Sequence, residues 1–99
     1  MNIEKLKDKM ATHEQYKTLC ISTGDVSEGD LDWLRDNYDD MIMARDTGFI
    51  IKLYEDMESN FEEFNNLSHK AYMLLSLAHI AGFRMIEIDA DAQPLLGEV

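Results

Sequence analysis

Carboxylates follow the ends of the three strands that the sequence predicts. Asp25 comes just after the first strand, Asp56 follows the second, and Asp89 and Asp91 close the third. The carboxyl ends of parallel strands meet at one edge of a sheet, where open α/β folds bind their ligands. Carboxylate oxygens are suitable ligands for Mg²⁺. The set therefore predicts a magnesium site of a phosphotransfer or nuclease-like enzyme, and the alternative is solvated loop carboxylates in an acidic chain.

The stretch CISTGDVSEGD, residues 20–30, stands where nucleotide-binding folds place a phosphate loop. Such a loop needs several glycines, so that backbone N–H groups can approach the phosphates, and usually a basic residue. The turn has Gly24 but no Lys or Arg, and carboxylates surround the start of the following helix. Ser27 with Asp30 three residues later is a variant of the capping box. We therefore predict a turn and a helix cap at this position.

Two groups of acidic residues could bind a basic partner, namely Asp32, Asp36, Asp39, Asp40, Glu58, Glu62 and Glu63. The first four recur at i, i+4, i+7 and i+8, which places them on one face of a helix. A regular row of carboxylates can imitate the charge of a nucleic-acid backbone and occupy a basic groove on another protein. The alternative is a solvated helix face without a partner.

Charge is the strongest signal in the composition, with a formal net charge of −11. Residues 1–17 hold four Lys against three acids and carry +1, whereas residues 18–99 hold five Lys or Arg against seventeen acids and carry −12. Direct binding to nucleic acid or to an anionic membrane is disfavoured, because it depends on Lys and Arg pairing with phosphates. A basic protein surface is the expected partner, and an acidity that serves only solubility is the alternative.

The remaining reactive side chains predict no cofactor. His69 and His79 lie ten residues apart, about 15 Å along a helix, and cannot share a metal ion. Cys20 is the only cysteine, and its place in the middle of a strand is typical of a small core residue. A single cysteine, the absence of an apolar run of roughly 20 residues and an N-terminus without a signal-peptide core predict a cytoplasmic protein.

The pattern of apolar residues predicts one α/β domain over residues 1–99, with a helix in 1–14 and a short tail in 92–99. Periodicity places helices and strands in the order αβαβαβ, over residues 2–13, 16–22, 25–42, 49–54, 61–81 and 84–91. Gly82 is the expected end of the last helix. Helix-length crossovers favour a three-stranded, mainly parallel sheet with the crossover helices on one face, although one antiparallel strand would also fit. The other face would stay partly uncovered and could form a homodimer.

The segments Cys20–Gly24 and Gly82–Asp91 resemble a group of small proteins of unknown function carried on bacterial plasmids, integrated elements and phages. Members have a strand that ends in Ser-Thr-Gly and, after a helix and a Gly, a strand that ends in Asp-x-Asp. Phe83 stands where the family usually has a second Cys. The resemblance covers about residues 16–91 and implies an α/β accessory protein of mobile elements, without an established activity.

The sequence thus favours a non-enzymatic acidic module or inhibitor that binds a basic surface of a host or defence protein. A magnesium-dependent enzyme that uses the carboxylates at the strand ends is the second hypothesis. A dimeric structural accessory protein that uses the uncovered sheet face is the third.

Overall fold

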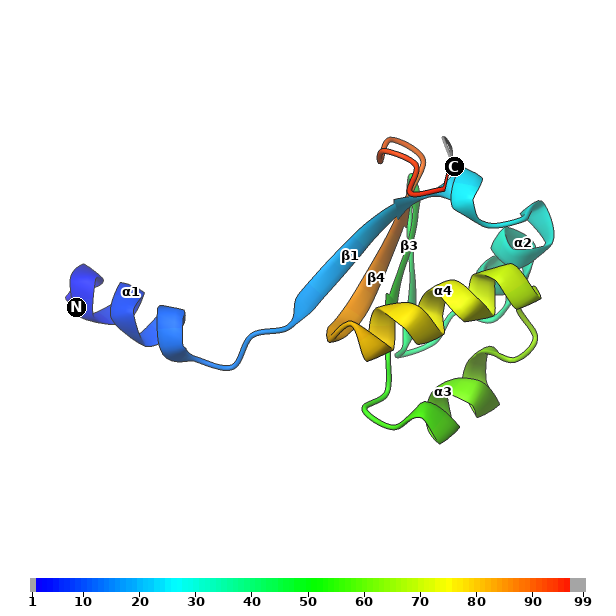
Figure 1. The fold of residues 1–99 in the computed structure, drawn as a ribbon. Coiled ribbons are helices and arrows are strands. Elements are labelled where there is room, and N and C mark those ends of the chain that lie inside the picture. The colour runs from blue at the N-terminus through cyan, green and yellow to red at the C-terminus, as the bar shows by residue number, and fades with distance from the viewer. Residues whose placement is uncertain (1, 97–99) are drawn as a thin grey trace.

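The structure, a computed structural model, describes residues 2–96 (Figure 1). Its helices are α1 (Ile3–Thr12), the 3₁₀ helix η1 (Thr23–Asp25), α2 (Glu28–Asp36), α3 (Met57–Phe64) and α4 (His69–Ile80). Its strands are β1 (Lys17–Ser22), β2 (Ile42–Arg45), β3 (Gly48–Lys52) and β4 (Phe83–Asp89). Of the single domain predicted over residues 1–99, residue 1 and residues 97–99 of the tail lie outside this range.

The four strands form one mixed sheet in the order β1-β4-β3-β2. Strand β1 runs parallel to β4, whereas β3 is antiparallel to both β4 and β2. The prediction of a small α/β domain is confirmed. The prediction of three mainly parallel strands in αβαβαβ order is wrong, because a fourth strand is present and two of the three pairings are antiparallel. The helix predicted over residues 61–81 is also wrong as one element, because residues 65–68 separate α3 from α4.

A two-residue hairpin explains the difference. Arg45 pairs with Gly48 across residues 46–47, so that β2 turns directly into β3. A hairpin joins antiparallel strands, whereas parallel neighbours need a long crossover. The helix predicted to reach about residue 42 ends at Asp36, and Ile42 instead begins β2. Strand β3 therefore enters the sheet from a hairpin and runs opposite to β1 and β4.

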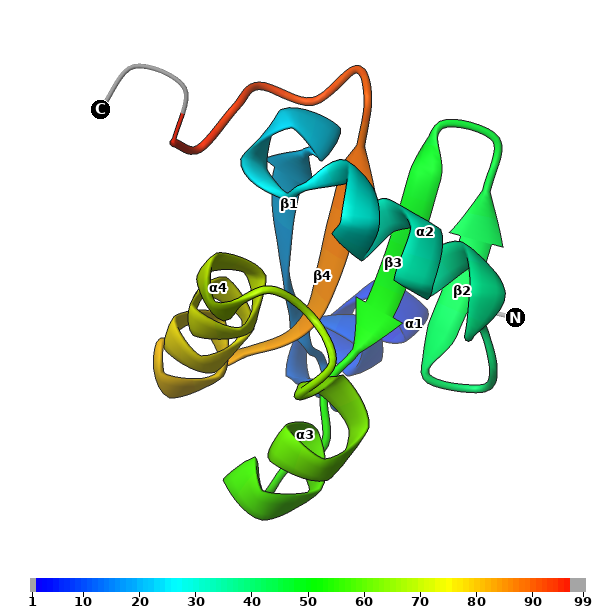
Figure 2. The ribbon, with the colours of Figure 1, turned by 90° about the vertical axis from the view of Figure 1, so that its right-hand side faces the viewer.

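Helices α2 and α4 lie on one face of the sheet (Figure 2). Alternate side chains of the strands point into this layer, and Ile21, Ile51, Ile86 and Ile88 are each at most 2% exposed. Phe64, at the end of α3, is fully buried in the same core. Because a strand alternates its side chains between the two faces, the intervening residues lie on the opposite face.

Two glycines are required by the backbone. A β-carbon at Gly48 would lie 1.7 Å from the carbonyl oxygen of Ile88, so that any larger residue would push β3 away from β4. Gly82 has a φ angle of +94°, in the left-handed region that suits a residue just after a helix. The prediction that Gly82 ends the last helix is confirmed, since α4 ends at Ile80 with Ala81 as its cap.

Helix α1 projects away from the rest of the chain, and none of its residues is buried (Figure 1). Asn2 caps the helix, because its side-chain oxygen accepts the backbone N–H of Lys5 at 3.1 Å. The radius of gyration is 15.3 Å, whereas a compact domain of 100 residues has about 13 Å. The helix predicted over residues 2–13 is confirmed, but it forms an arm that lies outside the core.

Candidate interaction surface

Asp25 is a buried residue that connects two segments of the domain. Its side chain is 1% exposed, and its two oxygens accept backbone N–H groups of Ser22 at 3.0 Å and of Leu95 and Leu96 at 2.8 Å each. Burial alone would raise the pKa of this carboxyl, but the three hydrogen bonds outweigh it, so that the pKa lies below its ordinary value. The carboxylate thus fastens the C-terminal segment to the end of β1.

The four carboxylates at the strand ends do not meet. Asp89 lies beside Ser22 at the end of the parallel pair β1 and β4, and its side chain accepts the N–H of Asp91 at 2.8 Å. Asp56 lies at the opposite end of the sheet, because β3 runs antiparallel to β4. The expectation of one common edge is therefore wrong. Within residues 2–96, no three His, Cys, Asp or Glu side chains are grouped so that they could hold a metal ion.

The loop between β1 and α2 caps two helices. The side chain of Ser22 accepts the N–H of Gly24, and Asp25 completes a capping box on η1. The predicted capping box of α2 is confirmed, with Ser27 and Asp30 bonded to each other's backbone N–H at 3.0 Å. Side chains of the loop itself therefore already accept the loop's N–H groups of Ser22, Gly24, Ser27 and Asp30, which would otherwise be available to a phosphate.

Asp30 also joins α2 to α4. Its carboxylate accepts the backbone N–H of Ser68 at 2.6 Å and the Ser68 hydroxyl at 2.7 Å. Burial would raise the pKa of Asp30, but these bonds and those from Ser27 lower it below the ordinary value. Asp30 thus fixes the starts of α2 and α4 through a contact with a residue 38 positions later in the sequence.

The acidic row predicted on one helix is interrupted. Asp32 and Asp36 are exposed on α2, and Asp32 pairs with Arg35 at 2.8 Å. Because α2 ends at Asp36, Asp39 and Asp40 belong to the following turn. Asp39 stabilises this turn by accepting the backbone N–H groups of Met41 and Ile42. The prediction that these four carboxylates lie on one face of a single helix is therefore wrong.

One residue from each predicted acidic group nevertheless meets the other in space, namely Asp39 and Glu63. Glu63 of α3 is half-buried beside Asp39. Burial, followed by the hydrogen bond and the charge of Asp39, raises the pKa of Glu63, whereas the pKa of Asp39 is lowered, mainly by the N–H of Met41. The pKa of Tyr54 is raised by burial and by the charges of Glu63, Asp39 and Asp56. We call the following residues the acidic face: Asp39, Asp40, Glu58, Glu62 and Glu63.

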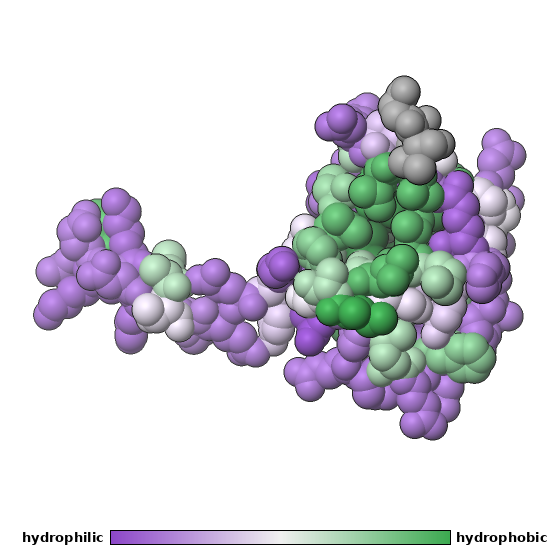
Figure 3. All heavy atoms as spheres, in the orientation of Figure 1, coloured by the Kyte–Doolittle hydropathy of each residue, from purple (hydrophilic) through white to green (hydrophobic). Residues whose placement is uncertain are grey.

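The sequence missed an exposed apolar surface on α4. Ala71, Leu75 and Ala78 are buried against the sheet, but three larger side chains at i, i+4 and i+7 face solvent, with exposed fractions of 41% for Met73, 55% for Leu77 and 73% for Ile80. Hydrophobic residues gather over this helix (Figure 3). Only one side of α4 can pack against the sheet in a two-layer fold, so its other apolar side chains stay in solvent.

Phe61 of α3 is a further exposed apolar side chain beside α4. It is 53% exposed, and its ring packs edge to face against Tyr72 of α4, with the ring centroids 5.8 Å apart. We call Met73, Leu77 and Ile80 the α4 stripe. The signal in the sequence was that the apolar residues of this twelve-residue helix recur on more than one of its sides.

The structure places Cys20 on the surface of the sheet and His79 beside the loop after β3. Cys20 is exposed on the open face of the sheet, so the prediction of a core residue is wrong. Burial, followed by the charges of Glu87 and Asp89, raises the pKa of its thiol. A ring nitrogen of His79 lies 2.7 Å from the carbonyl oxygen of Glu55, which ties the end of α4 to the loop after β3.

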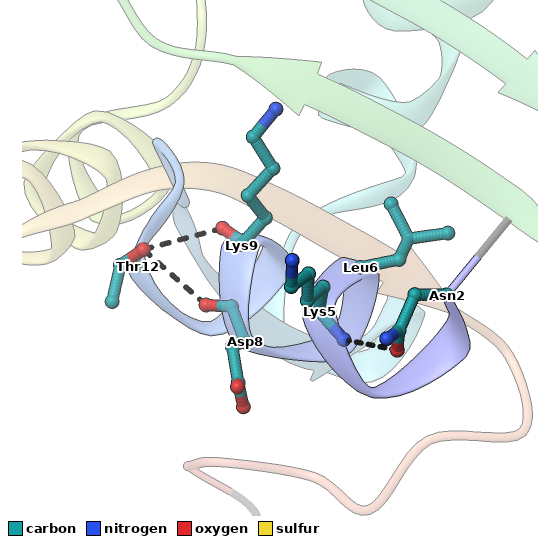
Figure 4. Close-up of a pocket in the computed structure, with 6 residues that line it drawn as sticks. All are labelled: Asn2, Lys5, Leu6, Asp8, Lys9 and Thr12. Carbon is teal, nitrogen blue, oxygen red and sulfur yellow. Dashed lines mark hydrogen bonds between the residues drawn. The ribbon is translucent and has the colours of Figure 1, made fainter.

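The surface of residues 2–96 has open hollows. The one in Figure 4 is lined by α1 and its cap alone, with Asn2, Lys5, Leu6, Asp8, Lys9 and Thr12 around it. A second hollow of about 360 Å³ lies between the end of β3 and the start of β4, where Tyr54 and Arg84 line it. A single helix lacks the converging polar groups that fix a small ligand.

The fold and these surfaces define a small α/β domain with a four-stranded mixed sheet. Residues 18–97 match the model of the C-terminal domain of DUF5983, a family of unknown function. The chain therefore belongs to this family, and helix α1 precedes the matched region. No curated protein and no solved structure matches the chain. Among residues 2–96, no helix is long and apolar enough to cross a membrane.

Proposed function

We propose that the domain is a non-enzymatic interaction module whose acidic face binds a basic surface of another protein. The supporting observation is that Asp39 and Glu63, from segments far apart in the sequence, lie side by side and share one environment. Burial, followed by the hydrogen bond and the charge of Asp39, raises the pKa of Glu63, so that the charged form of this side chain is disfavoured. A cationic partner surface would offset this effect by pairing with both groups.

The shape of the acidic face favours a compact partner site. The carboxylates do not form a long helical row, because α2 ends at Asp36 and Asp39 lies in a turn. A linear copy of a phosphate backbone would need an even spacing of charges along one axis. The cluster at the junction of α3 and the turn instead suits a localised group of Lys and Arg side chains.

The experiment replaces the acidic face and leaves the turn intact. Asp40→Asn, Glu58→Gln, Glu62→Gln and Glu63→Gln are combined, and Asp39 is kept because it holds two backbone N–H groups. We expect the wild type to recover a basic protein from a lysate of its source cells at low salt and to release it at high salt. The variant should bind the purified partner at least about tenfold more weakly, a loss of about 1.4 kcal/mol.

A matched control removes the same formal charge elsewhere, through Glu28→Gln, Asp46→Asn, Glu87→Gln and Asp91→Asn. This control should keep most of its affinity, since the proposal assigns binding to one face. If both variants bound the partner equally weakly, the affinity would depend on the net charge of the domain and not on the acidic face. Unchanged affinity of the first variant would contradict the proposal directly.

A further inference from the structure

We propose that the protein forms a homodimer in which α1 of each copy packs on the α4 stripe of the other. This inference goes beyond the proposed function, because it uses a different surface and a second copy of the chain as partner. It starts from two apolar helical surfaces, neither of which is covered by another part of residues 2–96.

The first surface is the apolar side of α1. Ile3, Leu6 and Met10 follow the spacing i, i+3, i+7 and are 65%, 36% and 61% exposed. A helix of ten residues is marginal in water without tertiary packing, and most helical stability in proteins comes from an apolar face packed on a neighbour. The arm thus lacks the contact that such a helix normally has.

The second surface has a matching length. Met73 and Ile80 are seven residues apart, as are Ile3 and Met10, so both apolar rows extend over about 10 Å along their helices. Helices pack when the side-chain ridges of one fit the grooves of the other, which requires rows of comparable length. The arm can therefore cover the α4 stripe from end to end.

The arm and the body carry net charges of opposite sign. On α1, Lys7 and Lys9 lie on either side of the apolar row, as their positions in the helix require. The segment that carries the arm, residues 1–17, has a net charge of +1, whereas residues 18–99, which include α4, have a net charge of −12. Lysines of the arm therefore meet an acidic body, which favours docking of α1 on a second copy.

The connection between arm and body points α1 away from its own α4. The side chain of Gln15 donates to the carbonyl groups of Met10 and Ala11 at 2.9 and 3.1 Å and holds the end of the helix. At the other end of the connection, the ammonium group of Lys17 lies 3.5 Å from the carbonyl oxygen of Ala81 and 4.6 Å from the centre of the Phe83 ring. The arm thus leaves the body beside the end of α4 and extends outward (Figure 1).

When two copies exchange their arms, two equivalent contacts cover the apolar side of α1 and the α4 stripe in both copies. A two-fold axis makes each copy donate one arm and accept one, which is the usual geometry of a homodimer. Specific interfaces bury about 1,200 to 2,000 Å² in total, and a two-fold axis supplies the arm contact twice. The interface is apolar and two bodies of equal negative charge repel each other, so added salt should preserve or strengthen the dimer. Binding through the acidic face should weaken under the same conditions.

The test begins with the mass of the full chain in solution, measured by light scattering after size exclusion over a range of concentrations. The wild type should be a dimer at high concentration. Leu6→Ser and Leu77→Asp should each raise the dimer dissociation constant at least about tenfold, and neither can empty the core because both side chains are exposed. Asp8→Ser, on another side of α1, and Met43→Ser, on the open sheet face, are the matched controls.

A disulfide experiment identifies the contact itself. Met10→Cys and Leu77→Cys are made in separate chains that both carry Cys20→Ser, and the two chains are mixed under mild oxidation. A heterodimer with one disulfide is expected. A wild type that is a monomer at every concentration, a dimer lost only in Met43→Ser, or no cross-link between the mixed chains would overturn the proposal.

Discussion

Replacing Asp30 by Ala should destabilise the domain strongly, because this residue is 3% exposed and holds two helix starts together. The substitution removes the acceptor for the N–H of Ser27 at 3.0 Å and for two groups of Ser68 at 2.6 and 2.7 Å. The donors of Ser68 are half-buried and would need new partners. Water can replace the acceptor only if the contact between the helices opens.

The expected cost follows from the kinds of hydrogen bond that are lost. Hydrogen bonds to a charged group contribute about 1.5 to 3 kcal/mol each, but losses within one network are not additive. We expect the free energy of unfolding to fall by about 3 kcal/mol, a large share of the 5 to 15 kcal/mol typical of a domain. For a chain of this size each kcal/mol corresponds to about 4 to 8 °C in Tm.

Urea unfolding, followed by circular dichroism and by the fluorescence of Trp33 on α2, measures this loss. Asp30→Asn keeps one oxygen acceptor and should lose about half as much. Asp32→Ala is the matched control, since Asp32 is exposed and its ion pair with Arg35 contributes less than about 1 kcal/mol. A cost of Asp30→Ala no greater than that of the control would refute the argument.

The stability that Asp30 provides should also depend on pH. Its pKa is lower in the folded protein than in the unfolded chain, where an Asp has a pKa of about 3.9. The unfolded state therefore binds more protons in the acid range, so the contribution is present above the unfolded pKa and is lost as the pH falls through the folded one. The difference in stability between wild type and Asp30→Ala should shrink below about pH 4.

Three other substitutions test separate parts of the structure. Asp25→Asn should speed amide hydrogen exchange at residues 95–96, because it weakens the acceptor that holds them, and unchanged protection would exclude this role. Gly48→Ala should cost more than about 2 kcal/mol in urea unfolding, since its β-carbon would meet the carbonyl oxygen of Ile88, and a loss below 1 kcal/mol would contradict the close approach. Glu63→Gln should raise the free energy of unfolding at pH 7 more than at pH 4, because the raised pKa shows that the charged form is disfavoured in the folded state; equal effects at both pH values would argue against the carboxylate pair.

The sequence located most elements because their signals are local. The capping box of Ser27 and Asp30 acts within three residues, and Gly82 ends α4 through its own backbone conformation. Strands β3 and β4 were found from alternating or β-branched residues. These features need no knowledge of the neighbouring elements, so the chain itself specifies them.

The hairpin was missed because its first strand also fits a helical pattern. Met41 and Ile42 continue the apolar spacing of α2, whereas Asn37 and Asp39 are turn formers. Asn37 caps the helix with its side-chain amide, which donates to the carbonyl of Trp33 at 2.7 Å. The cluster of Asn and Asp residues was therefore the signal that could have placed the helix end correctly.

What the sequence determined alone is the acidic composition, the capping box of α2, the end of α4 before Gly82 and the presence of an α/β domain. Strand order, the position of Asp56 at the far end of the sheet, the meeting of Asp39 with Glu63 and the exposed side of α4 were decided only by tertiary structure. The physical reason is that these features depend on which distant segments pair and on how many layers the chain can build. Local propensity does not encode either of these.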